Sequence, residues 1–147
     1  MTNAAQKWTD PEAQRIADGV HDMYDAFLAN DQQRFDSHLS RSATTWESHF
    51  DRLYTMHELD EFRDRREDAG ERPRLEVMRA EILAIDVWAD TALVRYLLIT
   101  AEEGGRPETT RVTEVMRLEE GEWRIVHHHA QLRDRPEAAF AGALVEA

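Results

Sequence analysis

The chain has 147 residues, of which 30 are acidic and 18 are basic, so its formal net charge is −12. A surface this negative repels phosphate backbones and anionic lipids, so neither nucleic acid nor a membrane surface is an expected partner. The sequence contains no cysteine, which excludes disulfides and a cysteine nucleophile. It has no apolar stretch of the ~20 residues that a membrane span needs, and residues 1–10 lack a secretory signal, so we expect a cytoplasmic protein.

The N-terminal part of the chain predicts helices. Asp10 is a typical helix cap, and Pro11 suits the first helical position. Apolar residues then recur with the spacing of one helical face, at Ile16, Val20, Met23, Tyr24, Phe27 and Leu28. A short second helix is expected next, with Phe35 and Leu39 pointing inward.

The middle of the chain mixes turn, strand and helix signals. Residues 40–42 predict a turn, and residues 43–46 have strand character. Helical spacing returns over residues 56–68, where the charged run at 63–68 is expected on the surface.

The second half of the sequence predicts strands. The expected strands are residues 75–85, 92–101, 109–118 and 123–132. The acidic turn at residues 119–122 contains Gly121 and separates two alternating runs, which is a hairpin signal. Helices followed by strands favour an α+β fold in which N-terminal helices pack on an antiparallel sheet. We expect one domain over residues 11–135, a disordered tail at 1–10 and a C-terminal tail at 136–147.

The last two expected strands carry a family resemblance. The first contains Arg111-Val112-Thr113, and after Gly121 the second contains residues 123–129, Trp-Arg-Ile-Val-His-His-His. This hairpin resembles the closing hairpin of the SnoaL-like branch of the nuclear transport factor 2-like (ketosteroid isomerase-like) superfamily. It is more similar still to the association domain of calcium/calmodulin-dependent protein kinases. The resemblance extends over residues 16–132.

The resemblance implies a fold and leaves the function open. In this superfamily the helices cover a strongly curved antiparallel sheet and form a cone-shaped pocket. Its members include isomerases, dehydratases, polyketide cyclases and domains that only bind or oligomerise, so the fold alone does not determine the function.

Six residues are expected to line the pocket and bind a ligand. They are Tyr24, Phe27, Trp46, Tyr96, Arg111 and His128. The resemblance implies that His128, with Val126 and Ala130, faces the pocket, as acid or base or as a polar lining residue without chemistry. Two arginines of the kinase association domain are replaced by Leu98 and Ala130, and the one that matches Arg111 is kept. Arg111 is therefore expected either to bind an anion or to form a structural ion pair with Glu47 or Asp60.

The histidine triplet also invites a metal hypothesis. His127 and His129 share one face of the strand, but no third ligand lies at a suitable spacing, so hydrogen bonding in the sheet or in a subunit contact is favoured over a metal. A ketosteroid isomerase mechanism needs a carboxylate base, and Glu47, Asp60 and Glu114 are the candidates. Glu114 has the opposite parity to Arg111 and is therefore expected outside the pocket.

Two functions from different classes follow from these residues. The first is a small-molecule-binding, oligomerising domain with an apolar pocket. The second is a cofactor-independent acid–base enzyme, an isomerase, cyclase or dehydratase, acting on a small carbonyl-bearing substrate. Neither a cofactor nor a metal is expected. The expected partners are a small acidic or carbonyl-bearing organic molecule and a second copy of the chain, because residues 92–101 are apolar on both faces.

Overall fold

The structure is a computed structural model that describes residues 7–61 and 74–133. The C-terminal tail, most of the N-terminal tail and the charged run at residues 63–68 lie outside the described residues. The helices are α1 (Pro11–Leu28) and α2 (Gln32–Asp36), and residues 56–61 are also helical. The strands are β1 (Leu39–Glu47), β2 (Tyr54–Thr55), β3 (Leu75–Trp88), β4 (Thr91–Glu102), β5 (Glu108–Glu119) and β6 (Glu122–Leu132).

Helix α1 begins and ends where the local sequence predicts. The Asp10 side chain accepts a hydrogen bond of 2.8 Å from the backbone N–H of Glu12, which satisfies one of the free donors of the first turn. Pro11 occupies the start of the helix, where a missing N–H costs nothing. The helix ends before Asn30, whose φ of 59° is left-handed. Its buried face contains Ile16, Val20, Met23 and Tyr24 of the predicted apolar stripe. Phe27 is half-buried, and Leu28, which was expected on the same face, is 41% exposed.

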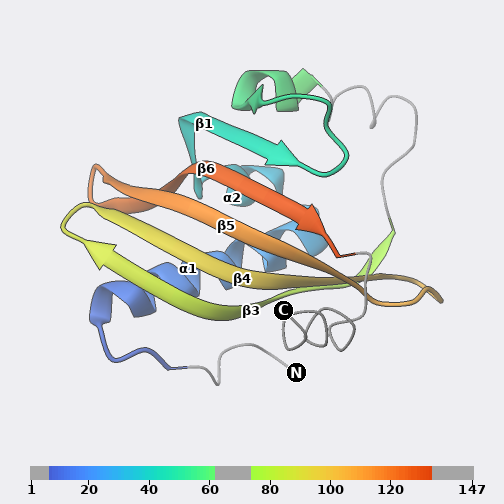
Figure 1. Cartoon of the computed structure of the whole chain (residues 1–147), viewed down its shortest axis with the longest axis horizontal. Helices are drawn as coiled ribbons and strands as arrows, with labels where there is room; N and C mark the ends of the chain where they lie inside the picture. The colour runs from blue at the N-terminus through green and yellow to red at the C-terminus, as the bar shows by residue number, and fades with distance from the viewer. Residues whose placement is uncertain (1–6, 62–73, 134–147) are drawn as a thin grey trace, which may run out of the picture.

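The strands form one curved sheet that is covered by helices on one face. Within the described residues the strand order is β2-β1-β6-β5-β4-β3. Figure 1 shows α1 and α2 behind this sheet, and α1 contacts β3 most closely. The architecture is the predicted α+β class. It differs in one detail, because β1 pairs with β6 in parallel, so the sheet is mixed instead of purely antiparallel.

The predicted hairpin between the last two strands is confirmed. Glu120 and Gly121 connect β5 to β6 with φ values of 53° and 82°. Positive φ at both central residues is the geometry of a type I′ turn, whose twist matches that of the flanking strands. Gly121 adopts this conformation without the steric cost that a side chain would bring.

Strand β1 is where the local prediction was wrong. It extends over the predicted turn at residues 40–42 and includes Leu39, which was assigned to a helix. Ser40 accounts for the difference, because its hydroxyl donates a 3.0 Å hydrogen bond to Glu119 at the end of β5. A tertiary contact therefore holds the segment extended despite its turn-like composition.

Bulges bend the sheet around the helices. The β3–β4 register shifts between Ile82 and Ala84, and the β5–β6 register shifts between Val115 and Met116. An extra residue on one strand bends and twists that strand locally. The bent sheet folds over α1 and buries a core that includes Ile16, Val20 and Tyr96. No helix within the described ranges has the length and hydropathy needed to cross a membrane.

Candidate functional site

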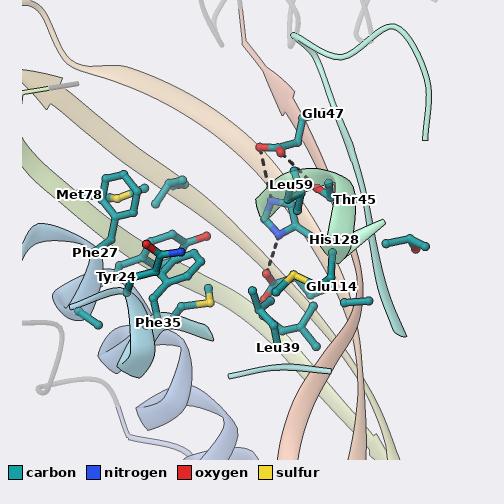
Figure 2. A pocket seen from close by; sticks show the side chains of 18 of the residues that line it. Tyr24, Phe27, Phe35, Leu39, Thr45, Glu47, Leu59, Met78, Glu114 and His128 are labelled. Atoms are coloured by element: carbon teal, nitrogen blue, oxygen red, sulfur yellow. Dashed lines mark hydrogen bonds and ion pairs between the residues drawn. The ribbon is translucent and has the colours of Figure 1, made fainter. Parts of the chain in front are cut away.

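A cavity of about 510 Å³ lies between the covered face of the sheet and the helices. Its wall is mostly apolar, and the aromatic part is made by Tyr24, Phe27, Phe35 and Phe50. The polar side chains Thr45, Glu47, Glu114 and His128 gather on the strands. Figure 2 shows the two groups apart, with the aromatic rings of α1 and α2 at one end and the polar group at the other. A ligand in this space would therefore meet an apolar end and a polar end.

Glu114 and His128 form the centre of the polar end. They are cross-strand partners in β5 and β6, and His128 Nδ1 lies 2.7 Å from Glu114 Oε2. Glu114 is 0% exposed although it is a carboxylate. A buried carboxylate is costly unless a partner compensates it, and the imidazole provides that compensation at one of the two oxygens.

The pKa of His128 is raised above its ordinary value of 6.5. Burial by itself lowers this pKa, because it disfavours the imidazolium. The hydrogen bond to Glu114 and the negative charges of Glu114 and Glu47 act in the opposite direction and prevail. His128 therefore holds a proton more readily than a free imidazole does.

Glu47 lies on the other side of the imidazole. Its Oε1 atom is 4.0 Å from His128 Nε2, and its Oε2 atom accepts a 3.2 Å hydrogen bond from the Thr45 hydroxyl. Glu47 is only partly buried. The imidazole thus lies between two carboxylates, one fully buried and one reached by solvent (Figure 2).

Two tyrosine hydroxyls form a second buried polar contact. The hydroxyls of Tyr24 and Tyr96 are 2.6 Å apart and buried. Burial and the charge of Glu114 raise both tyrosine pKa values well above 10, so both hydroxyls stay protonated and can donate. Tyr24 lines the cavity, whereas Tyr96 belongs to the core behind it.

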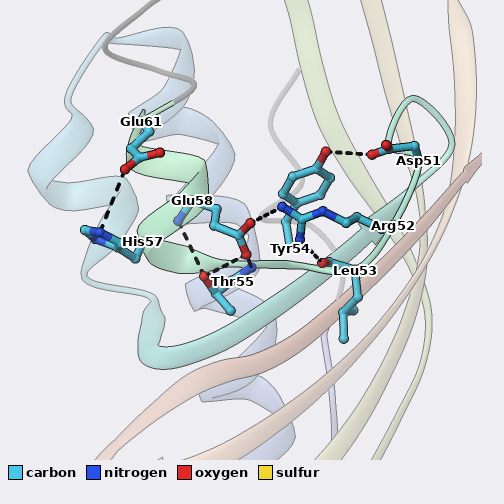
Figure 3. Close-up of polar contacts among 8 residues, drawn as sticks. All are labelled: Asp51, Arg52, Leu53, Tyr54, Thr55, His57, Glu58 and Glu61. Carbon is cyan, nitrogen blue, oxygen red and sulfur yellow. Dashed lines mark hydrogen bonds and ion pairs between the residues drawn. The ribbon is translucent and has the colours of Figure 1, made fainter.

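Residues 48–61, which we name the capping segment, close one side of the cavity. His49, Phe50, Met56 and Leu59 of this segment line the wall. Its outer side is fixed by polar contacts, shown in Figure 3: Arg52 pairs with Glu58, Tyr54 donates 2.6 Å to Asp51, and Thr55 binds Glu58. The sequence predicted the helical spacing from residue 56 onward, but gave no signal that this segment lies against the pocket.

Only some of the six expected ligand-binding residues line the cavity. Tyr24, Phe27 and His128 line the cavity, and Tyr96 is buried directly behind it. Trp46 does not line it: the indole is 55% exposed and lies 5.9 Å from the ring of His129, on the uncovered face of the sheet. Arg111 is also exposed and does not line the cavity.

The expected placement of Arg111 beside His128 was wrong, and so was the expected exclusion of Glu114. Side chains alternate along β5, so Arg111 and Glu114 must point to opposite faces. The helices cover the face of Val112, Glu114 and Met116, all buried. The available signal was Glu114 itself, since a charged residue between apolar neighbours of the same parity indicates a buried functional group.

The bulge in β6 changes the expected lining as well. His127 pairs with Val115 and Ile125 pairs with Met116, so Val126 is the extra residue. Ile125 lines the cavity in place of Val126. His127 hydrogen-bonds the Thr44 hydroxyl at 2.7 Å, in keeping with the favoured interpretation. Among residues 7–61 and 74–133, no group of three or more His, Cys, Asp or Glu side chains is arranged to hold a metal ion.

Comparisons with solved structures support the fold. An NTF-2 like protein of unknown function from Shewanella oneidensis superposes with a TM-score of 0.69 at 10% identity, covering 82% of this chain and 98% of that one. A cystatin-like protein of unknown function from Nostoc punctiforme gives 0.68 at 13%, with coverages of 90% and 99%. A ketosteroid isomerase-like protein from Erwinia carotovora atroseptica gives 0.65 at 16%, with coverages of 86% and 99%. At these identities the likeness concerns the fold alone.

Sequence comparison supplies the family. No curated protein matches the chain, and the similarity to kinase association domains stays a prediction. The family described as SnoaL-like domain matches residues 16–131, which include most of α1, all of α2, the residues that line the cavity and the Glu114–His128 pair. The chain therefore belongs to the SnoaL-like domain family and has the nuclear transport factor 2-like fold.

Proposed function

We propose that this domain binds a small organic molecule with an apolar body in the cavity between the sheet and the helices. The cavity has the volume and composition of a small-molecule site: about 510 Å³, mainly apolar walls and a few convergent polar groups. The observation that carries the proposal is the Glu114–His128 pair, a buried polar group at the end of an apolar space. A core that served only for packing would gain stability from apolar residues there.

A second function, cofactor-independent acid–base catalysis on a small carbonyl-bearing molecule, rests on the same pair. Glu114 fixes the orientation of the imidazole through Nδ1, which leaves Nε2 to exchange a proton. The raised pKa keeps a fraction of His128 protonated near neutral pH, so the ring can act as acid or base. This arrangement favours an enzyme more than the sequence did, because Glu114, a candidate base expected outside the pocket, lines the cavity beside His128.

Binding is tested with 3-phenylpropan-1-ol, a neutral probe with an apolar body and a polar end. Titration followed by amide NMR should perturb residues around Glu114 and His128. Leu59→Trp places a larger side chain in the cavity wall formed by the capping segment and should abolish the perturbation. Leu83→Trp is the matched control, because Leu83 is 60% exposed outside the cavity. Equal binding by both variants would contradict the proposed site.

Catalysis is tested separately, with a natural ligand that copurifies with the protein as the candidate substrate. Protein purified from its native host is denatured, and the released small molecules are identified by mass spectrometry. Turnover of an identified compound should be lost in His128→Gln and kept in His129→Gln. His129 is the next residue of the strand, but its ring lies beside Trp46 on the other face of the sheet. Turnover that survives His128→Gln would exclude the imidazole as acid or base and leave the binding function.

Self-association is a further part of the proposal. Leu93 and Leu97 lie on the uncovered face of the sheet and are only partly buried within one chain. A second copy packed on this face would bury them together with Trp46. Arg95 and Arg111 lie on the same face, so the contact would be mixed instead of purely apolar. A cytoplasmic location stays a prediction from the sequence.

A further inference from the structure

The permanent charges that line the cavity are all negative. Of the described residues that line it, Asp31, Glu47 and Glu114 are acidic, and none is arginine or lysine. His49 and His128 are the described lining residues that can become cationic. The chain as a whole adds a net charge of −12. A carboxylate or phosphate entering this space would meet repulsion from fixed charges without an arginine to compensate it.

Glu114 also has an unused acceptor. Its Oε2 atom is bound by His128, and its Oε1 atom is buried without a hydrogen bond of ordinary length from a described residue. The Tyr96 hydroxyl also interacts with this carboxylate, which contributes to the raised pKa of Tyr96. A buried carboxylate oxygen without a donor is unfavourable, and native structures rarely leave one that serves no function. Glu114 lines the cavity but is 0% exposed, so a donor on a bound molecule reaches this oxygen once the side chains that cover it shift.

Cationic side chains of the protein that could have served as this donor are engaged elsewhere. Arg34 on α2 pairs with Asp22 of α1. Arg95 pairs with Asp86 on the other face of the sheet. Arg111 is exposed on that face too. Nothing within the described part of the chain therefore offers a permanent positive charge to the cavity.

We propose that the molecule bound here is a small organic amine with an apolar body, whose protonated nitrogen donates a hydrogen bond to Glu114 Oε1. This inference rests on the proposed binding function and names its ligand class. The aromatic rings of Tyr24, Phe27 and Phe35 suit the apolar body, and Glu47 adds a second negative charge at the polar end. It reverses the expectation of an acidic ligand, which depended on Arg111 in the pocket.

Three probes that share one body separate the possibilities: 3-phenylpropylamine, 3-phenylpropan-1-ol and 3-phenylpropionate. Each is titrated into the full-length protein near neutral pH and followed by calorimetry and amide NMR. We expect the amine to bind at least about tenfold more tightly than the alcohol, because a hydrogen bond between charged groups is stronger than a neutral one. The carboxylate should bind more weakly than the alcohol.

Glu114→Gln keeps the shape of the side chain and removes its charge. The preference for the amine over the alcohol should fall to within about threefold in this variant. Glu81→Gln makes the same change at an exposed position of β3 and should leave the preference intact. If Glu114→Gln does not fold, Glu47→Gln provides the second variant, with a smaller loss of preference expected.

The results of these titrations separate the proposed amine ligand from the proposed binding function. If the alcohol binds in the cavity and the amine binds no better, or the carboxylate binds best, the amine proposal is overturned and the binding function stands. An amine preference that Glu114→Gln and Glu47→Gln both leave unchanged also overturns it. If none of the three probes perturbs the cavity, both proposals are overturned.

Discussion

The interaction between Glu114 and His128 can be measured directly by a double-mutant cycle with Glu114→Gln and His128→Gln. The cycle isolates the energy of the pair from the separate effects of changing each residue. Both partners are held in one geometry, with 2.7 Å between Nδ1 and Oε2, and the carboxylate is 0% exposed. We therefore expect a coupling energy typical of a charged and buried hydrogen bond, about 1.5–3 kcal/mol at acidic pH.

The sign of the pH dependence follows from the raised pKa of His128. Its pKa is above the ordinary 6.5 in the folded protein, so protonation stabilises the folded state. This contribution is fully present below about pH 6.5 and is lost as the pH rises through the folded-state pKa. In Glu114→Gln the main cause of the increase is gone and burial dominates, so the pKa of His128 should fall.

Urea unfolding followed by tryptophan fluorescence measures the four free energies, at about pH 5.5 and about pH 8.5. NMR titration of the imidazole provides the pKa direction independently. The matched control is the pair His57 and Glu61, 4.0 Å apart with side chains 88% and 59% exposed, for which no coupling is expected. A coupling below about 0.5 kcal/mol at both pH values, or a larger one at alkaline pH, would refute the reasoning.

Three further predictions concern the core, the capping segment and the assembly. Tyr96→Phe leaves the Tyr24 hydroxyl without its buried partner, so it should cost about 1–2 kcal/mol of unfolding free energy. Tyr24→Phe should cost less when it is added to Tyr96→Phe than when it is made in the wild-type protein. Wild-type stability of Tyr96→Phe would contradict this prediction. Arg52→Ala breaks the pair with Glu58 and should speed amide exchange over residues 54–58 with little change in global stability; unchanged exchange would show that the pair does not hold the segment. Light scattering should report about twice 17.1 kDa, falling to 17.1 kDa in Leu97→Glu, and a wild-type monomer at micromolar concentration would exclude the dimer.

Local features of the sequence were sufficient for most elements of the fold. The cap at Asp10, the apolar stripe of α1 and the turn at Gly121 act over a few residues, so their patterns survive without tertiary context. The last hairpin also carried the family resemblance that residues 16–131 now support. The extension of β1 through residues 40–42 was not predictable in this way, since it depends on a contact with Glu119.

The candidate site shows where local reasoning ends. Tyr24, Phe27 and His128 were expected at the cavity and line it, whereas Trp46 and Arg111 lie on the uncovered face. Alternation along a strand predicts which side chains share a face, but it does not predict which face the helices cover.

Tertiary packing determines which face of the sheet the helices cover. Helix α1 buries its apolar stripe against one face of the sheet, and the bulge at Val126 shifts the facing of β6 by one residue. Together they bring Glu114 and His128 into the cavity and leave Arg111 outside it. The sequence alone determined the elements and their family, because these depend on neighbours in the chain; the sign of the charge in the cavity was decided only when distant segments packed together.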